Sequence, residues 1–203
     1  MEGSRPSLRQ MRMRAISAML LALGALLTLT ANASAPLNYA LDSSASSVSA
    51  KVPFFGVSSK TAQFPRMSGR VTIVPDAPER ATIDVTFDAT ALQAPDTVTL
   101  NRLRGEKFFW VDKYPSVRFV GNSLKLSSDR RGTVDGMLTA RGITQPATLD
   151  VTFDSPPLTA PAGQEISFTG KTTIDRRKFG MKSYQLIVGN KVKITLRAKM
   201  LPR

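Results

Sequence analysis

Apolar and polar residues alternate strictly along much of this chain. Ile83, Val85 and Phe87 would share one face of an extended strand, while the intervening Thr and Asp residues would share the other. Residues 147–154 and 191–200 repeat the pattern. Strands with one dry and one wet face are typical of antiparallel sheets, because strands in buried parallel sheets are apolar on both faces. The sequence therefore predicts an all-β, antiparallel architecture.

Turn residues divide the rest of the chain into further strands. These are predicted over residues 37–52, 69–74, 116–126, 133–140, 166–174 and 183–188. Gly189 and Asn190 tolerate positive φ, so we expect a tight hairpin before residues 191–200. Residues 155–163 form a proline-rich loop in this interpretation. The sequences of residues 81–88 and 147–154 are almost alike. Either an internal duplication or the convergence of half-buried strands on one pattern explains this similarity.

One segment, residues 96–109, has helical periodicity. Leu100, Leu103 and the Phe108–Phe109 pair can share a face, and Gly105 predicts a short or imperfect helix. About eight antiparallel strands with one short helix predict a closed, eight-stranded β-barrel, which leaves no exposed edges. Such a barrel is either filled by its own side chains or holds one small ligand. The periodicity does not decide between these two states.

Residues 1–33 are predicted to be a secretory signal peptide, and residues 34–203 to be one exported domain. Four arginines precede an uncharged stretch at residues 15–29, and Ala31 and Ala33 then fit the small-residue rule for cleavage. Cleavage after Ala33 is preferred, because a cut after Ala35 would place Pro36 just beyond it. The alternative is an uncleaved membrane anchor, but the apolar run is shorter than the ~20 residues of a spanning helix.

The chain contains neither histidine nor cysteine. Their absence excludes Ser-His-Asp triads, histidine-ligated haem, conventional zinc hydrolase sites and disulfides. Asp84, Asp88, Asp150 and Asp154 alternate with other residues on the wet strand faces, which is typical of an outer surface rather than of paired catalytic carboxylates. We therefore predict a protein that is not an enzyme and has no metal or cofactor.

The charge balance is strongly basic, with 28 Lys and Arg against 15 Asp and Glu. Removing residues 1–33 takes away four arginines and Glu2, which leaves 24 basic and 14 acidic residues. Such an excess favours anionic partners such as a phosphate or an anionic lipid surface, or it simply solvates the protein. Nucleic acid is not expected as a partner of an exported protein.

Three segments carry a specific resemblance to a known family. They are Leu-Arg-Gly-Glu-Lys-Phe-Phe-Trp at residues 103–110, Gly-Met-Leu-Thr-Ala-Arg-Gly-Ile at 136–143, and Thr-Ile-Asp-Arg-Arg-Lys-Phe-Gly-Met at 173–181. Together they resemble the YceI-like family of exported lipid-binding proteins. The resemblance implies a lipocalin-like barrel that binds a polyisoprenoid or related amphiphile, a periplasmic or secreted location, and often a homodimer. Where the family has an Arg-Asp-x-His run, residues 99–102 read Thr-Leu-Asn-Arg.

The candidate site follows from this barrel and its inward faces. The predicted cavity lining is Phe54, Phe55, Val85, Phe87, Phe108, Phe109, Phe119, Leu149, Val151, Phe153, Phe179 and Met181, although a packed core uses the same residue types. Arg102, Arg104 and Arg141 are candidates for gripping an anionic headgroup, because arginine offers two parallel donors. The alternative for Arg141 is a structural bond to the turn at Gly142.

The family's Asp-Arg pair lies within residues 175–178 and is expected to be an ion pair that pins a loop. The predicted function is an exported, non-catalytic binding protein that holds a long apolar ligand, such as a polyisoprenoid, quinone or fatty derivative. The alternative is a filled barrel that docks on anionic surfaces through basic residues such as Lys191, Lys193, Arg197 and Lys199.

Overall fold

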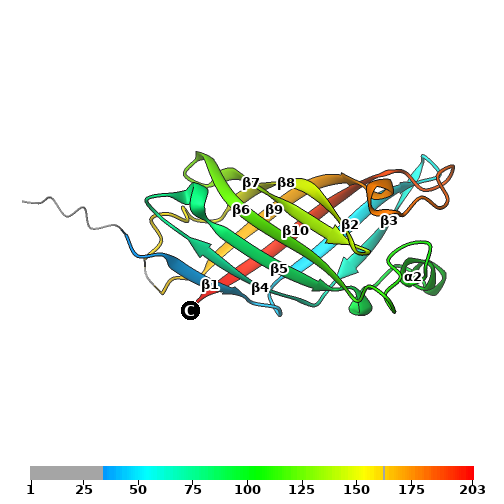
Figure 1. Cartoon of the computed structure of the whole chain (residues 1–203), viewed down its shortest axis with the longest axis horizontal. Helices are drawn as coiled ribbons and strands as arrows, with labels where there is room; N and C mark the ends of the chain where they lie inside the picture. Colours follow the sequence, from blue (N-terminus) through cyan, green and yellow to red (C-terminus); the bar gives the residue numbers. More distant parts are fainter. Residues whose placement is uncertain (1–33, 162) are drawn as a thin grey trace, which may run out of the picture. The chain divides into compact units, whose positions relative to one another are not determined.

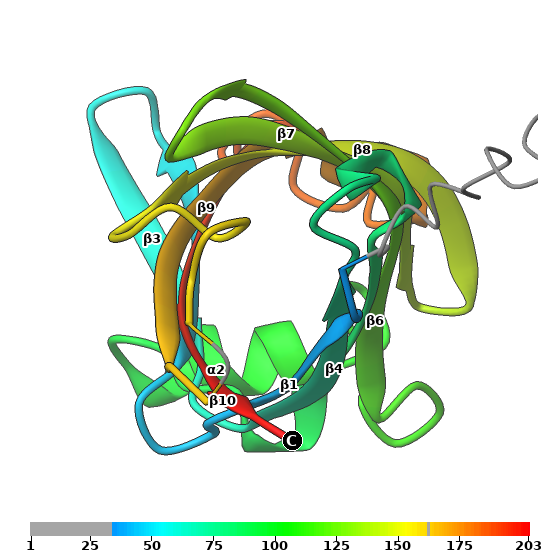
Figure 2. The same ribbon diagram turned by 90° about the vertical axis from the view of Figure 1, so that its left-hand side faces the viewer.

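The described part of the chain, residues 34–161 and 163–203 of a computed structural model, is an antiparallel sheet that closes on itself (Figures 1 and 2). The prediction of a signal peptide concerns residues 1–33 and lies outside these residues. Within the described ranges, no helix is long and apolar enough to cross a membrane.

Ten strand segments form the sheet, in the order β1-β4-β5-β6-β7-β8-β9-β10-β2-β3, and β1 also pairs with β10. The segments are β1 (Leu37–Leu41), β2 (Ser47–Phe54), β3 (Ser58–Phe64), β4 (Met67–Ile73), β5 (Thr82–Asp88), β6 (Ser116–Ser128), β7 (Arg131–Ala140), β8 (Ile143–Phe153), β9 (Ile166–Asp175) and β10 (Lys191–Pro202). Helix α2 (Thr97–Arg104) and the short 3-10 turns η1 (Pro78–Arg80), η2 (Ala89–Ala91) and η3 (Arg176–Phe179) complete the described elements.

These ten segments occupy eight positions around the barrel. β1 and β2 both pair with the same side of β10, with Leu41 opposite Met200 and Ser47 opposite Arg197. β4 pairs with β1, and β3 pairs with β2. The segments β1 and β2 are therefore two parts of one interrupted strand, and β3 and β4 are two parts of the next. The predicted eight-stranded, antiparallel barrel with one α-helix is therefore confirmed.

The break between β1 and β2 keeps the backbone of β10 hydrogen-bonded. The N–H of Asp42 donates to the carbonyl of Lys199 at 2.9 Å. The N–H of Lys199 donates in turn to Oγ of Ser46 at 3.0 Å, and Ser46 is buried. A backbone group left unpaired inside a sheet costs free energy, so Ser46 replaces the missing ladder bond.

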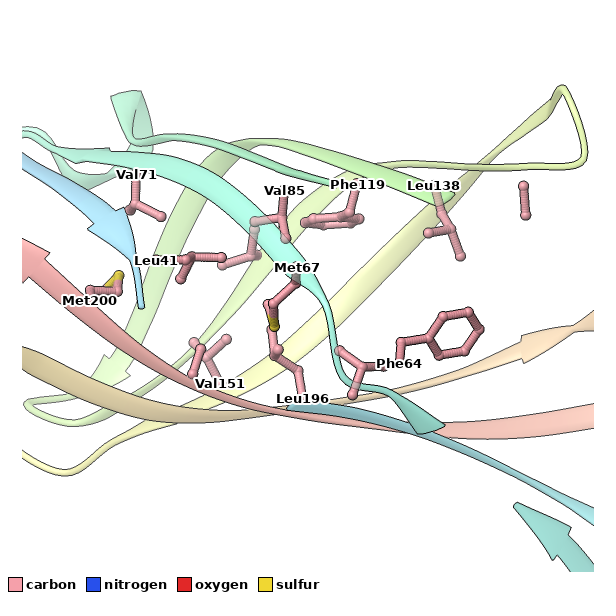
Figure 3. Packing of buried hydrophobic residues seen from close by; sticks show 14 of the residues in the cluster. Leu41, Phe64, Met67, Val71, Val85, Phe119, Leu138, Val151, Leu196 and Met200 are labelled. Atoms are coloured by element: carbon pink, nitrogen blue, oxygen red, sulfur yellow. The ribbon is translucent and has the colours of Figure 1, made fainter. Parts of the chain in front are cut away.

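Apolar side chains fill the end of the barrel that is distant from α2. Figure 3 shows Met67, Val85, Phe119 and Leu196 pointing toward one another from β4, β5, β6 and β10, with Leu41, Val71 and Met200 beyond them. Gly121 and Gly136 lie opposite each other in β6 and β7 beside the Phe119 ring. A Cβ atom on Gly136 would lie 2.7 Å from Cζ of Phe119, so the ring lies where only glycine leaves room.

The helix is shorter than the sequence predicts. Its N-cap, Asp96, accepts a hydrogen bond from the N–H of Thr99 at 2.7 Å, as expected for a capping aspartate. The helix ends at Arg104, whereas the prediction extended to residue 109. Trp110 adopts a left-handed φ of 50° and the N–H of Phe109 donates back to the carbonyl of Leu103 at 2.9 Å. Phe108 and Phe109 therefore lie in turns that fold back under α2.

Two other local predictions are wrong. Residues 183–187 form turns instead of a strand, and Gly189–Asn190 is the end of a long connection from β9 to β10 rather than a tight hairpin. Tyr184, with a φ of 57°, interrupts any extended conformation there. The sequence analysis also missed β3, whose residues Ser58–Phe64 begin with four polar side chains.

Arg176 organises the loop that connects η3 to β10. Its side chain is 3% exposed and donates to the carbonyls of Ser183 (2.8 Å), Val188 (2.9 Å) and Gly189 (2.9 Å), as well as to that of Met181. The expected ion pair joins Asp175 to Arg177 instead, at 2.6 Å. The two adjacent arginines thus have different roles, because η3 turns one inward and the other outward.

We predict that Arg176→Met destabilises the fold by about 3 kcal/mol, since it leaves several buried carbonyls without donors. The matched control is Arg177→Met, which removes a partly exposed ion pair and should cost less than about 1 kcal/mol. Urea unfolding followed by circular dichroism measures both values. Equal losses in the two variants would contradict the role assigned to Arg176.

Gly136→Ala should cost about 2 kcal/mol, because its Cβ would also lie 2.5 Å from the carbonyl oxygen of Val120. Gly105→Ala is the control, since Gly105 has a φ of −72° and its nearest atoms would be 3.4 Å away. That variant should change the free energy of unfolding by less than about 1 kcal/mol. Thermal and urea unfolding distinguish the two, and a neutral Gly136→Ala would show that Phe119 can move.

Candidate functional site

Helix α2 lies at one end of the barrel (Figure 1), and a cavity opens at that end. Its outer chamber has a volume of about 200 Å³ and lies between β2, β3, α2 and the loop of residues 181–188. Its apolar lining includes Val52, Phe54, Val98, Leu103, Ile187 and Val188. The helix and the loop are therefore parts of the site, because each supplies one of its walls.

A second, inner chamber of about 110 Å³ lies deeper in the barrel. Its wall is built from inward-facing strand residues, among them Val48, Phe64, Leu138, Leu149, Ile194 and Leu196. Ala50, Phe109, Arg176, Met181 and Val192 line both chambers, so the two are neighbours that share one wall. The interior is thus filled at one end and hollow at the other.

Aromatic rings form the boundary and the mouth of the cavity. Phe109 lines both chambers and meets Phe64 edge to face, with ring centroids 5.5 Å apart. At the mouth, Phe108 stacks on Tyr184 with centroids 6.0 Å apart. These offset and edge contacts are favourable arrangements for aromatic pairs. They fix the turns after α2 against the loop of residues 181–188.

The outer chamber carries the polar groups. Lys60 donates to Asp96 at 2.8 Å, and this hydrogen bond, with those from Thr99, lowers the pKa of Asp96 to about 2. Arg102 lies beside the Tyr184 ring, 5.7 Å from its centroid. Lys60, Asp96, Thr99 and Arg102 all line the outer chamber, so a ligand there would meet charged and hydrogen-bonding groups.

Arg176 is the charged residue of the inner chamber's lining. Burial lowers the pKa of its guanidinium from the ordinary 12.5, but arginine remains protonated in proteins. Among the described residues no carboxylate lies within salt-bridge distance of it; its observed acceptors are carbonyls of the loop. The guanidinium therefore lies against the loop, and the wall of the inner chamber itself is apolar.

The structure divides the predicted lining residues into three groups. Those that line a chamber are Phe54, Phe87, Phe108, Phe109, Leu149 and Met181. Val85, Phe119, Val151 and Phe153 are buried in the core without lining either chamber, and Phe179 is buried in η3. Phe55 is 59% exposed at the β2–β3 turn. The strand residues of the first two groups all face the interior of the barrel. Their depth along the barrel therefore decides whether they line a chamber or pack in the core.

The three headgroup candidates also lie apart. Arg102 lines the outer chamber, whereas Arg104 is exposed at the end of α2 and lines neither chamber. Arg141 and Gly142 both have positive φ and form the two-residue turn between β7 and β8. The Arg141 side chain donates to the carbonyl of Gly180 at 3.0 Å, which ties that turn to η3.

Sequence reasoning missed several lining residues. Ala50 and Val52 alternate with polar residues in β2, so their pattern could have identified them. Tyr184 and Ile187 had no such signal, because their positions depend on the loop that Arg176 holds. The contribution of Arg176 to the cavity wall was equally hidden among three consecutive basic residues.

Known proteins share both sequence and fold with this chain. A UPF0312 protein of Pseudomonas putida is 29% identical over 132 residues, which covers 65% of this chain and 69% of the relative. The crystal structure of Burkholderia cenocepacia BcnA superposes with a TM-score of 0.69 at 23% identity, covering 78% of this chain and 98% of BcnA.

A second solved structure is a polyisoprenoid binding domain from Saccharophagus degradans, with a TM-score of 0.63 and 15% identity, covering 82% of this chain and 99% of that domain. At these identities the structural likeness describes the barrel fold. The model of the YceI-like domain matches residues 39–200, from β1 to the end of β10. The match spans nearly the whole barrel, and the chain therefore belongs to the YceI-like domain family.

Proposed function

We propose that this protein is an exported, non-catalytic carrier of an elongated amphiphile with an apolar tail. The observation that carries the proposal is the pair of adjoining chambers, one almost wholly apolar and the other bearing charged groups at its mouth. A tail lies in the inner chamber in this proposal, and the polar end lies in the outer chamber near Arg102 and the Lys60–Asp96 pair.

The dimensions of the cavity support a chain-like ligand. A closed apolar cavity of about 150 Å³ is large enough to bind benzene. Chambers of about 200 and 110 Å³ in series suit a molecule longer than one ring. Each methylene that leaves water for such a wall contributes about 0.8 kcal/mol. An isoprenoid, quinone or fatty tail has this chemistry.

Arg176, which lines both chambers, would lie beside the part of the ligand that joins its tail to its polar end. Arginine has five N–H donors, and four of those of Arg176 are used by loop carbonyls. A buried charge is stabilised by further partners, so an acceptor on the ligand would gain from its proximity. The polyisoprenoid binding domain with the same fold is consistent with this ligand class.

The alternative of a filled barrel that docks through its basic exterior has less support. The chambers are not features of a filled barrel. Lys191, Lys193 and Arg197 do lie on the exposed face of β10, but Lys199 pairs with Glu165 at 2.7 Å. A basic outer face is compatible with either function, whereas the hollow interior favours the carrier.

Organic extraction of the purified protein, followed by mass spectrometry, tests the proposal directly. We expect a long-chain lipid in the extract at a constant ratio to protein, and displacement of that lipid by cis-parinaric acid with a rise in fluorescence. Protein that yields no lipid and does not bind parinaric acid would refute the carrier function.

Ala50→Phe should block the cavity, because Ala50 lines both chambers. Displacing two methylenes of a ligand costs about 1.6 kcal/mol, so affinity for parinaric acid should fall at least ~10-fold. Thermal stability should be kept or raised, since the ring fills an apolar space. Ser49→Phe, on the outward face of the same strand, is the matched control and should leave the affinity unchanged.

If Ala50→Phe disturbs folding, Val192→Phe provides the same test from β10, because Val192 also lines both chambers. Unchanged affinity in a folded, blocked variant would place the ligand elsewhere.

A further inference from the structure

The most exposed large apolar side chains of the described residues lie on the elements that form the cavity end of the barrel. Leu186 is 100% exposed, Val57 93%, Phe55 59% and Val98 58%, and Tyr184, on the same loop as Leu186, is 38% exposed. The exposed fractions of Val120, Met137, Ile143 and Leu201 are between 38% and 45%. Single exposed apolar residues are ordinary, but a cluster at a functional opening marks an interaction surface.

Backbone hydrogen bonds hold two of the exposed tips side by side. The N–H of Phe55 donates to the carbonyl of Ile187 at 2.8 Å, and the N–H of Gly189 donates to that of Pro53 at 2.8 Å. Phe55 itself has a left-handed φ of 52°, which holds the β2–β3 turn in a conformation that is costly for an aromatic residue. The turn and the loop of residues 181–188 therefore project together at one end of the barrel (Figure 1).

The third part of the rim is α2, which places Val98 at the mouth of the same chamber as Ile187 and Val188. We define the rim as Phe55, Val57, Val98, Tyr184 and Leu186. Val98 and Tyr184 line the outer chamber, and the other three lie on the β2–β3 turn and on the loop of residues 181–188. These exposed side chains do not pack in the core, and their position suits insertion into an apolar layer.

Cations flank this apolar rim. Lys107 lies 5.6 Å and Arg102 5.7 Å from the centroid of the Tyr184 ring, and Lys182 follows η3 on the same loop. Within residues 34–161 and 163–203 none of the three forms a salt bridge. The nearby acids are Asp96, which Lys60 already neutralises, and Glu106, which shares a surface hollow with Lys107 and Lys182. The surface beside the rim therefore keeps a net positive charge.

We propose that the rim docks on the surface of an anionic phospholipid bilayer, so that the cavity opens directly onto the lipids. Apolar side chains that enter the headgroup region together with Lys and Arg that face anionic lipids are the two components of interfacial binding. The arrangement rests on the proposed carrier function and adds the place where the ligand is exchanged: an amphiphile passes between bilayer and outer chamber without crossing water.

Vesicle co-sedimentation tests the proposal with protein purified after expression of the full-length chain. Binding is measured to vesicles of phosphatidylcholine alone and of phosphatidylcholine mixed with phosphatidylglycerol. We expect binding to the mixed vesicles, weakened by 1 M salt because the screening length then falls to about 3 Å. Failure to bind the mixed vesicles, by protein that binds parinaric acid, would overturn docking and leave the carrier function intact. Protein that binds neither would refute the carrier function itself.

Val57→Ser/Leu186→Ser should lower the partition coefficient onto mixed vesicles at least ~10-fold, since two apolar side chains no longer enter the bilayer. Val120→Ser/Met137→Ser is the matched control, because these exposed residues face each other on β6 and β7, away from the mouth. The control should bind as the parent does. Equal losses in both variants would show non-specific adsorption and overturn the proposal.

Charge variants provide a second, independent test of where the docking surface lies. Lys107→Gln/Lys182→Gln should weaken binding to mixed vesicles, whereas Lys171→Gln/Lys193→Gln, on the outer faces of β9 and β10, should not. The opposite result would place docking on the side of the barrel. A dimer in light scattering that Val57→Ser/Leu186→Ser dissociates would show that a second copy covers the rim, and would also overturn the proposal.

Discussion

Closing the sheet forces every strand residue to face either a sealed interior or the outside. The interior of an eight-stranded barrel is just wide enough for its own side chains, so a cavity exists only where those side chains are small or turned aside. In this protein the end near β1 is packed with Met67, Phe119 and Met200. The end near α2 has the smaller Ala50 and Val192 in its wall, and the hollow lies there.

The strands alone leave the hollow end of the barrel open. Helix α2 covers part of it, and the loop between η3 and β10 covers another part. Neither element has a core of its own; the loop is held mainly by carbonyl bonds to Arg176. The stability of the fold and the shape of the cavity are therefore linked at one buried guanidinium, because the residue that fixes the loop also lines the cavity.

The barrel could be predicted from the sequence because alternation determines which face of each strand is dry. The division between core and cavity could not, since Val85 and Phe87 are equivalent in the pattern and only their depth along the barrel separates them. β3 was missed because Lys60 and Thr61 line a polar mouth rather than a dry core. Arg176 and Arg177 are identical in type, and only the turn of η3 gives one of them a buried position. The family resemblance supplied the ligand class, which no periodic pattern contains.

The pairing of β1 with β10 joins Tyr39 to Pro202, almost the full length of the described chain. Contacts so distant in sequence form late, because the loop between them must first lose its conformational freedom. β10 completes the ring, since it bonds to β9 on one side and to β2 and β1 on the other. A chain in which β10 has not yet paired cannot close the barrel, so the sealed interior forms only when β10 joins the sheet. The cavity at the α2 end therefore depends on a strand pairing between the two ends of the described chain, far from the cavity itself.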